Sequence, residues 1–439
     1  MTPAAQVVLA FGSVAVLLGV ITAVRHVAAA WTIGAEVQRK LVHIATGLYA
    51  LTLPWLFPDR WPVYMLVVLT LGVMLLLRLP GSRLGTTLHG VQRTSYGDFL
   101  LAIAVGLCLF FADDALYLYV LPIAVLTLAD AAAALAGSTY GTRLFRVEDG
   151  QKSVEGSVVF FVVTLLISII CLMLMTPLAA PNILLLSVLV AAFGTLVEAD
   201  SWRGFDNLFL PMGLLIFLAA HSASSMPELA TLAAIFLLSS LATHALAPRL
   251  GLSAHAGRVY LVAVFLLLSV TALQNTVAPI LVLAAHAWSR SAAPCTARFP
   301  DLDIVAALAL VSFGWLALGN ATTWNAISFY GVAASGMFIA LSALALAPRP
   351  LPERAGQLLA IGLGLCLLRA HVLWLNPEAT NWNGPMWTLF AASLLLAALP
   401  PALLPRAFAK ARVAKVTLLS LVLPLSAYLA AADLTGGAA

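Results

Sequence analysis

The sequence predicts an all-α, polytopic integral membrane protein, and three observations support this fold class. First, 62% of the 439 residues are hydrophobic and only 9% are charged, which leaves too little polar surface to cover a soluble protein. Second, apolar runs of about 17–25 residues, the length that crosses a bilayer as a helix, recur along the whole chain. Third, the basic residues fall in alternate connections between these runs.

The apolar runs define about 16 predicted transmembrane helices. The first run has no basic residue before it and Arg25, Arg39 and Lys40 after it, whereas a secretory signal peptide has the opposite order of charge. We therefore expect this run to be a retained helix. The predicted spans are 5–24, 41–57, 61–79, 98–112, 117–137, 154–176, 182–199, 207–222, 229–247, 258–273, 277–289, 303–319, 325–347, 356–374, 386–404 and 416–432.

The basic residues predict the orientation of these spans. Of the 22 lysines and arginines, Arg60 lies in an even-numbered connection and Arg369 well within a span, which leaves 20 in the odd-numbered connections or at the span ends that border them. Basic residues favour the cytoplasmic side of a membrane. The odd-numbered connections are therefore predicted to be cytoplasmic, and both termini non-cytoplasmic.

The charged motifs divide the chain into two predicted domains. The first four cytoplasmic connections, before about residue 225, carry both signs of charge, whereas later ones are mainly basic. We therefore expect a membrane catalytic domain at 1–225, with its active site facing the cytoplasm, and an additional membrane-helical module of unknown role at 226–439. The scattered basic residues give no sign of nucleic-acid binding. No Walker loop is present, and the four cysteines form no CxxC pair.

The segment "EVQRKLVHIATG" (36–47) places Arg39, Lys40 and His43 at the start of the second span. Arg39 and His43 are four residues apart, so they share one face of a helix. The segment has two interpretations. It is either a basic membrane anchor with a capped histidine, or an anion clamp in which Arg39 and Lys40 neutralise a phosphate.

The segment "TLADAAAALAGSTYG" (127–141) contains an aspartate within an apolar helix. An ionised carboxylate is costly there unless it meets a cation or a metal, so Asp130 is predicted to be functional. Asp130, Ala134, Gly137 and Gly141 form one stripe along the helix. The small residues fit close helix packing, but they would also let a phosphate–metal unit approach the backbone.

The segment "RLFRVEDGQKSVEGS" (143–157) combines Lys152 and Glu155 with Ser153, Gly156 and Ser157 at the start of the sixth span. A helix N terminus with a lysine and small residues suits a phosphate group. Glu155 is expected either to cap the helix amides or to hold a divalent metal.

Two more segments place polar residues at helix entries. The first, "VEADSWRGFDNLFLP" (197–211), carries Glu198, Asp206 and Asn207, which suit either a solvated turn or the binding of magnesium or ribose hydroxyls. The second, "VQRTSYGDFL" (91–100), carries Ser95 and Asp98, for which helix capping is the default interpretation.

In this order and spacing, "RKLVHIATG", "DAAAALAGSTYG", "KSVEGS" and the pattern "E…DN…P" resemble the motifs of the membrane polyprenol kinases. This family includes phytol kinase, dolichol kinase and a CTP-dependent diacylglycerol kinase, and is related to phosphatidate cytidylyltransferases. The resemblance covers about residues 30–215. One departure is Ala129, where many relatives have glycine.

The resemblance implies transfer of a phosphoryl group, with Mg²⁺ or another divalent cation, from a nucleoside triphosphate, typically CTP, to a lipid alcohol in the bilayer. The alternatives are a CTP-dependent phosphatidate cytidylyltransferase and a lipid or anion transporter. The residues together predict Asp130, Lys152 and Glu155 as catalytic; Arg39, Lys40, Gly137, Gly141, Lys152, Ser153, Gly156, Ser157 and Asn207 as nucleotide- or phosphate-binding; and Asp130, Glu155, Glu198 and Asp206 as metal ligands.

Overall fold

A computed structural model describes residues 1–439 except 32, 79–95, 148–149, 202–203, 250, 271–272, 294, 323–325, 377–385 and 437–439. Arg93 and Ser95 of the predicted helix entry lie outside the described residues, as does Arg203. The chain forms two compact units, Met1–Leu238 and Ser239–Ala439. The border between them falls within a helix, a little beyond the predicted boundary at residue 225.

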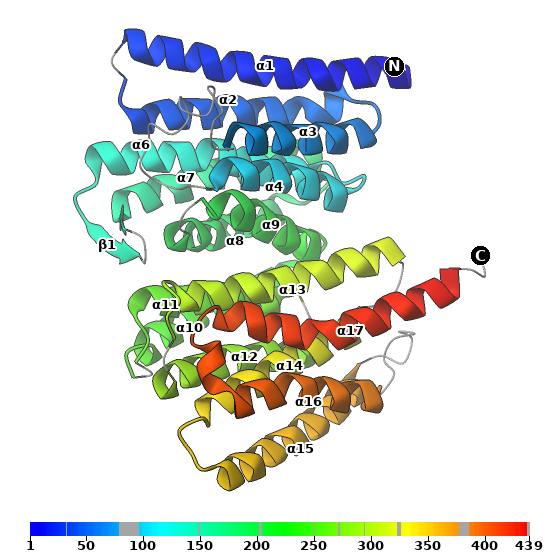
Figure 1. Ribbon diagram of the computed structural model, residues 1–439. Coiled ribbons are helices and arrows are strands. Elements are labelled where there is room, and N and C mark those ends of the chain that lie inside the picture. Colours follow the sequence, from blue (N-terminus) through cyan, green and yellow to red (C-terminus); the bar gives the residue numbers. More distant parts are fainter. Residues whose placement is uncertain are drawn as a thin grey trace. The chain divides into compact units, whose positions relative to one another are not determined.

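Unit 1 is built mainly of helices (Figure 1). Long apolar runs form these helices because a helix satisfies every backbone polar group within its own segment. The helices are α1 (Pro3–Ala30), α2 (Ala35–Leu56), α3 (Trp61–Arg78), α4 (Gly97–Ala112), α5 (Tyr117–Ala124), α6 (Asp130–Tyr140), α7 (Val154–Met175), α8 (Ala180–Asp200), α9 (Asp206–His221) and α10 (Met226–Leu246), with a π-helical turn, η2 (Val125–Ala129), between α5 and α6.

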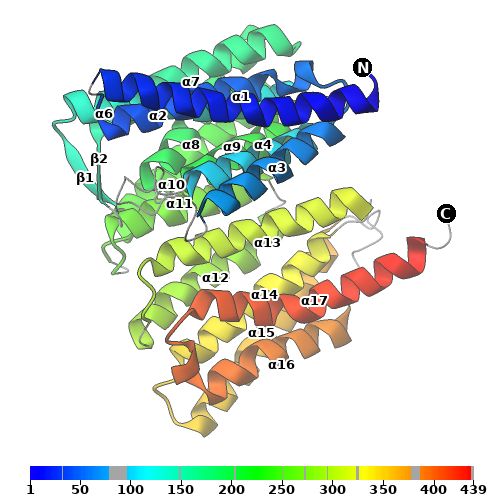
Figure 2. The ribbon, with the colours of Figure 1, turned by 45° about the horizontal axis from the view of Figure 1, so that its top comes forward.

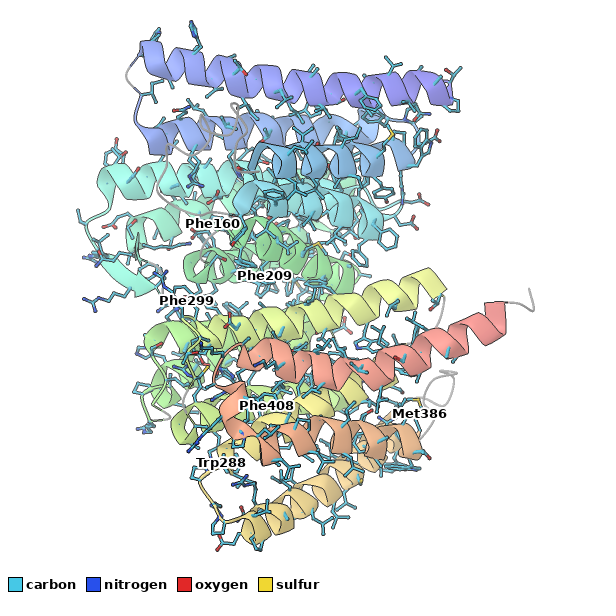
Figure 3. The ribbon with its side chains drawn as sticks, viewed as in Figure 1. Phe160, Phe209, Trp288, Phe299, Met386 and Phe408 are labelled. Carbon is cyan, nitrogen blue, oxygen red and sulfur yellow. The ribbon has the colours of Figure 1, made fainter. Side chains whose placement is uncertain are left out.

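The core of unit 1 lies among α4, α5, α8 and α9, which are its most buried helices. Phe193 of α8 and Phe217 of α9 stack with ring centroids 5.7 Å apart. Phe160 of α7, labelled in Figure 3, is also fully buried. Helix α1, in contrast, is largely exposed, as expected of a helix that faces lipid.

A β-hairpin interrupts the helices of unit 1 between α6 and α7, and the sequence interpretation did not predict it. Strands β1 (Leu144–Val147) and β2 (Gly150–Ser153) pair antiparallel, with Phe145 opposite Lys152. Figure 2 shows the hairpin beside the end of α6. It is the only sheet in the part of the chain that the structure describes, so the all-α class holds apart from this element.

Unit 2 surrounds one central helix, α14, in which almost every residue is buried. Helices α12, α15, α16 and α17 all pack against it. Small residues make this packing close: a Cβ at Gly336 would lie 3.1 Å from Ser420 of α17. The helices of unit 2 are α11 (Ala254–Val270), α12 (Leu273–Ala292), α13 (Pro300–Thr322), α14 (Ile327–Ala345), α15 (Leu351–Leu375), α16 (Trp387–Leu403) and α17 (Arg412–Gly436), with a 3₁₀ turn, η3 (Pro405–Phe408).

Every one of the predicted spans overlaps a helix of the structure, which confirms an all-α membrane architecture. Among the described residues, eight helices are long and apolar enough to cross a membrane: α1, the continuous α5–η2–α6 segment, α7, α8, α10, α14, α15 and α17. Other predicted spans correspond to shorter apolar helices, including α3, α4 and α9. The count of sixteen spans and the location of the termini remain predictions.

Candidate functional site

Five polar side chains from four different elements of unit 1 meet where several helices begin or end. Lys40 and His43 lie in the first turns of α2, and Asp130 follows the π-turn η2. Lys152 lies on strand β2, and Glu198 is two residues before the end of α8. We call these five residues the Asp130 cluster. Residues far apart in sequence therefore form one site.

Asp130 forms a buried ion pair with Lys40. Their Oδ2 and Nζ atoms are 2.6 Å apart, and the side chains are only 6% and 4% exposed. Desolvating both charges costs several kcal/mol, which close contact and further hydrogen bonds must offset. The aspartate predicted to need a cation thus has one, supplied by the "RK" motif. The Lys40 ammonium points at this carboxylate, and phosphate binding by Lys40 stays a prediction.

The π-turn before Asp130 sets the local geometry of this pair. The backbone N–H of Asp130 bonds the carbonyl of Val125 rather than that of Leu126, which a regular α-helix would use. His43 Nε2 lies 3.0 Å from the Leu126 carbonyl. Since a carbonyl oxygen only accepts, Nε2 carries the proton. The same nitrogen is 3.6 Å from Asp130 Oδ2, so His43 adds a second polar neighbour to the carboxylate.

Close helix contact holds this region together. A Cβ on Gly47 of α2 would collide with Thr127 of the π-turn, so only glycine allows the two segments to approach this closely. Thr127 itself donates to the carbonyl of Ile123 and is fully buried. Pro122, which has no backbone N–H, lies just before the turn and interrupts the regular helical ladder.

Lys152 forms a second ion pair, with Glu198. Its Nζ lies 2.7 Å from Glu198 Oε1, and it also donates to the main-chain carbonyl of Glu198. Burial lowers the pKa of Lys152, but the nearby Glu198 and Asp206 carboxylates outweigh it, so the pKa is raised above its ordinary value. Asp130 contributes in the same direction, which places the two ion pairs within electrostatic reach of each other. Lys152 therefore stays cationic at neutral pH.

The predicted phosphate-binding glycines pack α6 against the start of α7. A Cβ on Gly137 would lie 2.7 Å from Ser153 Oγ, and one on Gly156 would lie 2.9 Å from the Ala133 carbonyl. Gly141 also packs against Ser153. The stripe thus makes the close helix contact that was the alternative interpretation. Contact between these glycines and a phosphate stays a prediction.

The N terminus of α7 is already capped by its own residues. Ser153 Oγ accepts from the Gly156 N–H at 3.1 Å, and Ser157 donates to the Ser153 carbonyl at 3.3 Å. Glu155 accepts from the Thr142 hydroxyl at 2.5 Å and from the Arg143 N–H at 3.1 Å. Glu155 therefore anchors the connection between α6 and the hairpin, and a metal role for it stays a prediction.

The other predicted residues lie around the same helix ends. Asn207 is buried and donates to the Gly97 carbonyl at 2.7 Å, which fixes the start of α9 against the start of α4. Asp206 is half-buried in the first turn of α9. Arg39 is exposed on α2. Asp98 is exposed in the first turn of α4, where no side chain caps the helix.

The acids of this region suit magnesium by their chemistry. Among the described residues, no three His, Cys, Asp or Glu side chains gather closely enough to form a protein cage for a metal. Mg²⁺ does not need such a cage, because it is commonly held by one or two carboxylates together with substrate phosphates and water. Asp130, Glu198 and Asp206 all lie within electrostatic reach of Lys152. Metal binding by any of them stays a prediction.

His43 and the π-turn are the parts of the site that the sequence interpretation missed. It named His43 only as a capped neighbour of Arg39. A signal was present, since Lys40 and His43 are three residues apart and share a helix face. The π-turn had a weaker signal in Pro122, because many prolines in membrane helices produce no such turn.

Comparison with known proteins gives one match. The chain is 30% identical, over 182 residues, to a phytol kinase from Synechocystis sp.. The matched region is 41% of this chain and 76% of that protein. No family model matches the sequence. No solved structure matches it either.

Proposed function

Since the chain belongs, through its N-terminal half, to the polyprenol kinase family, we propose that it transfers a phosphoryl group from CTP to an isoprenoid alcohol. The acceptor lies in the bilayer with its hydroxyl at the cytoplasmic boundary, where the odd-numbered connections are predicted to lie. Phytol, dolichol and other polyprenols are the acceptor class. Phosphoryl transfer of this kind requires mainly positioning and neutralisation of charge.

The convergence of the Lys40–Asp130 and Lys152–Glu198 pairs is the observation that supports this proposal most strongly. Phosphoryl transfer needs a cation for the phosphates and a carboxylate near the attacking hydroxyl. The structure brings both types of residue to the ends of α2, α8 and β2. The motifs that carry them are also those that resemble the family.

Lys152 is the proposed contact to the nucleotide phosphates. It is 23% exposed, whereas Lys40 is 4% exposed, so Lys152 is the lysine that a nucleotide can reach from solvent. A phosphate that approached it would replace part of its contact with Glu198. Arg39, exposed on α2, offers a further positive charge near the same helix end.

Asp130 has two candidate roles at the acceptor side. As a general base it would accept the proton of the lipid hydroxyl as the oxygen bonds the γ-phosphorus, while the bond to the β-phosphate oxygen breaks and CDP leaves. As a metal ligand it would act with Glu198 or Asp206 to hold magnesium, which neutralises phosphate charge when bound. Lys40 and His43 would orient the carboxylate in either role.

Product analysis tests the proposal directly. Membranes that contain the full chain are incubated with magnesium, CTP labelled in its γ-phosphate or its cytosine, and one acceptor: phytol, farnesol, dolichol, diacylglycerol or phosphatidate. The expected products are CDP and a prenyl phosphate that carries the γ label. Pyrophosphate and a cytosine-labelled lipid would instead identify a cytidylyltransferase, and no labelled lipid from any acceptor would refute both.

A further inference from the structure

The end of unit 2 at which α15 begins is strongly basic. Two segments meet there: 346–354, which joins α14 to α15, and 403–415, which includes η3 and leads into α17. They contain one acid, Glu353, and six basic residues: Arg349, Arg354, Arg406, Lys410, Arg412 and Lys415. The predicted cytoplasmic connections of unit 1 carry both signs of charge instead. We call these two segments the basic end of unit 2.

Three of the six basic side chains are bonded within the protein. The guanidinium of Arg354 donates to the carbonyl of Arg349 at 2.9 Å and to the carbonyl of Ala402. Because Ala402 lies at the end of α16, directly before the second segment, Arg354 fastens the two segments together. Arg412 and Lys415 likewise donate to main-chain carbonyls. These three residues hold the basic end in shape.

The other three basic side chains are exposed. Among the residues that the structure describes, none forms a hydrogen bond or an ion pair with the side chain of Arg349, Arg406 or Lys410. Phe408, labelled in Figure 3, lies between the last two and is only 4% exposed, so it anchors η3 in the core of unit 2. The basic end is therefore fixed to the core while three of its charges face outward.

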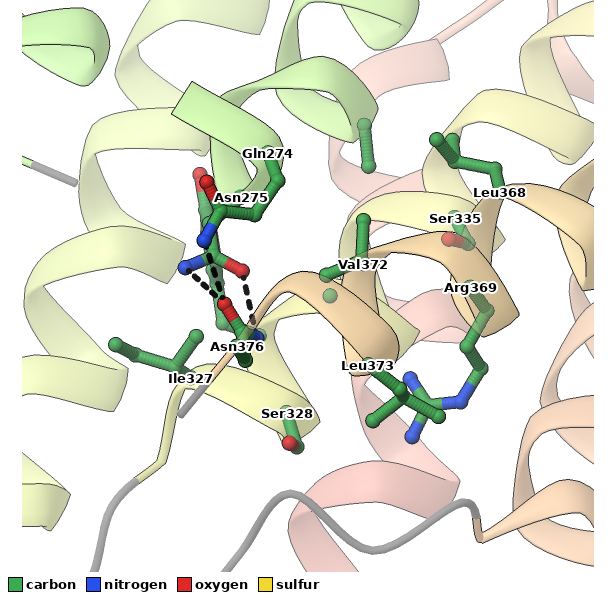
Figure 4. Close-up of a pocket in the computed structure, with 13 residues that line it drawn as sticks. Gln274, Asn275, Ile327, Ser328, Ser335, Leu368, Arg369, Val372, Leu373 and Asn376 are labelled. Carbon is green, nitrogen blue, oxygen red and sulfur yellow. Dashed lines mark hydrogen bonds between the residues drawn. The ribbon is translucent and has the colours of Figure 1, made fainter. Parts of the chain in front are cut away.

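The opposite end of α15 has a different arrangement (Figure 4). Gln274 Nε2 donates to Asn376 Oδ1 at 2.9 Å, and Asn376 Nδ2 donates to Asn275 Oδ1 at 3.2 Å. These amides bond one another and so join the start of α12 to the end of α15. Polar groups at that end have protein partners, whereas the three exposed charges of the basic end are available to a partner outside the protein.

Apolar side chains beside these charges favour a lipid as the partner. Leu351, Leu403 and Leu404 are 56%, 61% and 64% exposed, at the start of α15 and the end of α16. Arg349 is two residues from Leu351 in sequence, and Arg406 is two residues from Leu404. The headgroup layer of a bilayer lies directly outside its hydrocarbon core. Positive charges so close to the ends of apolar helices therefore lie at the level of the lipid phosphates.

We propose that the basic end of unit 2 binds anionic phospholipids, with their headgroups against Arg349, Arg406 and Lys410 and their chains beside the exposed leucines. Clusters of about four to eight basic residues at the cytoplasmic end of a membrane helix are typical of such binding. This surface contains no residue of the Asp130 cluster, so it does not depend on the proposed function.

Photocross-linking to a lipid tests this proposal on the full chain. The purified protein is reconstituted in phosphatidylcholine vesicles with a trace of photoreactive phosphatidylglycerol or of photoreactive phosphatidylcholine, and the labelled peptides are identified by mass spectrometry. We expect phosphatidylglycerol to label segments 346–354 and 403–415 in preference to phosphatidylcholine. Both leaflets contain the probe, so the result does not depend on the predicted orientation.

Two triple variants test the role of charge. Arg349→Gln/Arg406→Gln/Lys410→Gln should lower the preference for phosphatidylglycerol at least tenfold, because each basic residue near anionic headgroups strengthens binding roughly fivefold. Arg349→Lys/Arg406→Lys/Lys410→Arg keeps the charges and should retain the preference. Loss of the preference in this second variant as well, with the protein folded by size-exclusion chromatography, would contradict a role for charge.

The matched control is Arg143→Gln/Arg146→Gln/Arg249→Gln, which removes the same number of exposed charges outside the basic end. It should leave the labelling of both segments unchanged. Equal labelling by the two lipids, or full labelling of the variant that lacks the three charges, would overturn the proposal. Labelling that inorganic phosphate abolishes, while chloride at the same ionic strength does not, would show a site for soluble anions and would also overturn it.

Discussion

The Asp130 cluster of unit 1 and a charged group in unit 2 both bury an aspartate, but they differ in how they satisfy it. Asp130 is bonded by a lysine, Lys40, and neighbours a histidine. Asp301 of α13 accepts from Tyr260 at 2.9 Å, pairs with Arg290 and lies 3.3 Å from His286. Asp301 thus has three protein partners, which leave little room for a ligand.

Access also differs between the two groups. Lys152 is 23% exposed beside Glu198, so the Asp130 cluster opens to solvent on one side. His286 and Asp301 are 0% and 2% exposed. A nearby arginine, Arg412, is buried and donates hydrogen bonds to main-chain carbonyls at the end of α12. We infer that the group in unit 2 holds helix ends together, whereas the Asp130 cluster is arranged for chemistry.

The largest expected effect is that of Asp130→Asn on catalysis. Loss of the carboxylate removes either the base or a metal ligand, and loss of a general base alone costs about 10²–10⁴ in rate. The measurement is kcat with labelled CTP and the best prenol acceptor. Asp114→Asn, at an exposed acid of the same unit, is the control and should leave kcat unchanged.

Asp130→Asn also leaves Lys40 buried without its counter-ion, which could reduce the amount of folded protein. The double variant Lys40→Gln/Asp130→Asn removes both charges and should recover most of the lost stability. Removing both partners of a buried ion pair is less destabilising than leaving one buried charge without its counter-ion. We expect it to fold and remain inactive. Activity in the folded double variant would contradict the assignment of Asp130.

Asp301→Asn should give the opposite result. Breaking a buried ion pair by removing one partner costs about 3–5 kcal/mol, so we expect a large fall in thermal stability. The kcat of the remaining folded protein should stay normal, since Asp301 lies in unit 2. Asp303→Asn, two residues away and exposed, is the control. A loss of kcat without a loss of stability would show that the comparison between the clusters is wrong.

Lys152→Ala should act mainly on the nucleotide. Loss of one charged contact to phosphate, worth about 1.5–3 kcal/mol, raises the KM for CTP by about 10–100-fold. Arg146→Ala is the matched control, because Arg146 is exposed on the neighbouring strand of the hairpin. An effect confined to the KM of the lipid alcohol would contradict the role given to Lys152.

The pKa of Lys152 predicts how this contact depends on pH. Because the folded-state pKa is raised, the Lys152 ammonium is present below the ordinary lysine value of 10.5 and is lost only as pH rises through the folded value. Lys152 should therefore contribute no change in KM between pH 6 and about 9. A KM change in that range that disappears in Lys152→Ala would show that its pKa is lowered instead.

Hydropathy and motif spacing predicted the helices and every residue of the Asp130 cluster except His43, but not how those residues pair. Apolar runs determine helices locally, so each span was visible in the sequence. The pairing of Lys40 with Asp130 joins residues 90 positions apart, and only tertiary packing determines it. The hairpin at 144–153 is short and polar, and its strands are set by the ends of α6 and α7 rather than by a strong β pattern.

Glu155→Gln should have the smallest effect, and it tests whether all the acids of the "KSVEGS" region serve one purpose. Glu155 contacts the Thr142 hydroxyl and the Arg143 N–H, and a glutamine oxygen can accept from both. If Glu155 only anchors the hairpin, kcat should fall by less than about threefold, because substitutions away from a functional contact usually have small effects. Glu198→Gln, which removes the partner of Lys152, should lower kcat far more.

The magnesium dependence of both variants separates the roles. Loss of a metal ligand raises the magnesium concentration that the enzyme requires, whereas loss of an anchoring residue does not. A steep rise in the magnesium requirement of Glu155→Gln would therefore move Glu155 from the hairpin to the metal, and would mean that its carboxylate turns away from Thr142 when substrate binds.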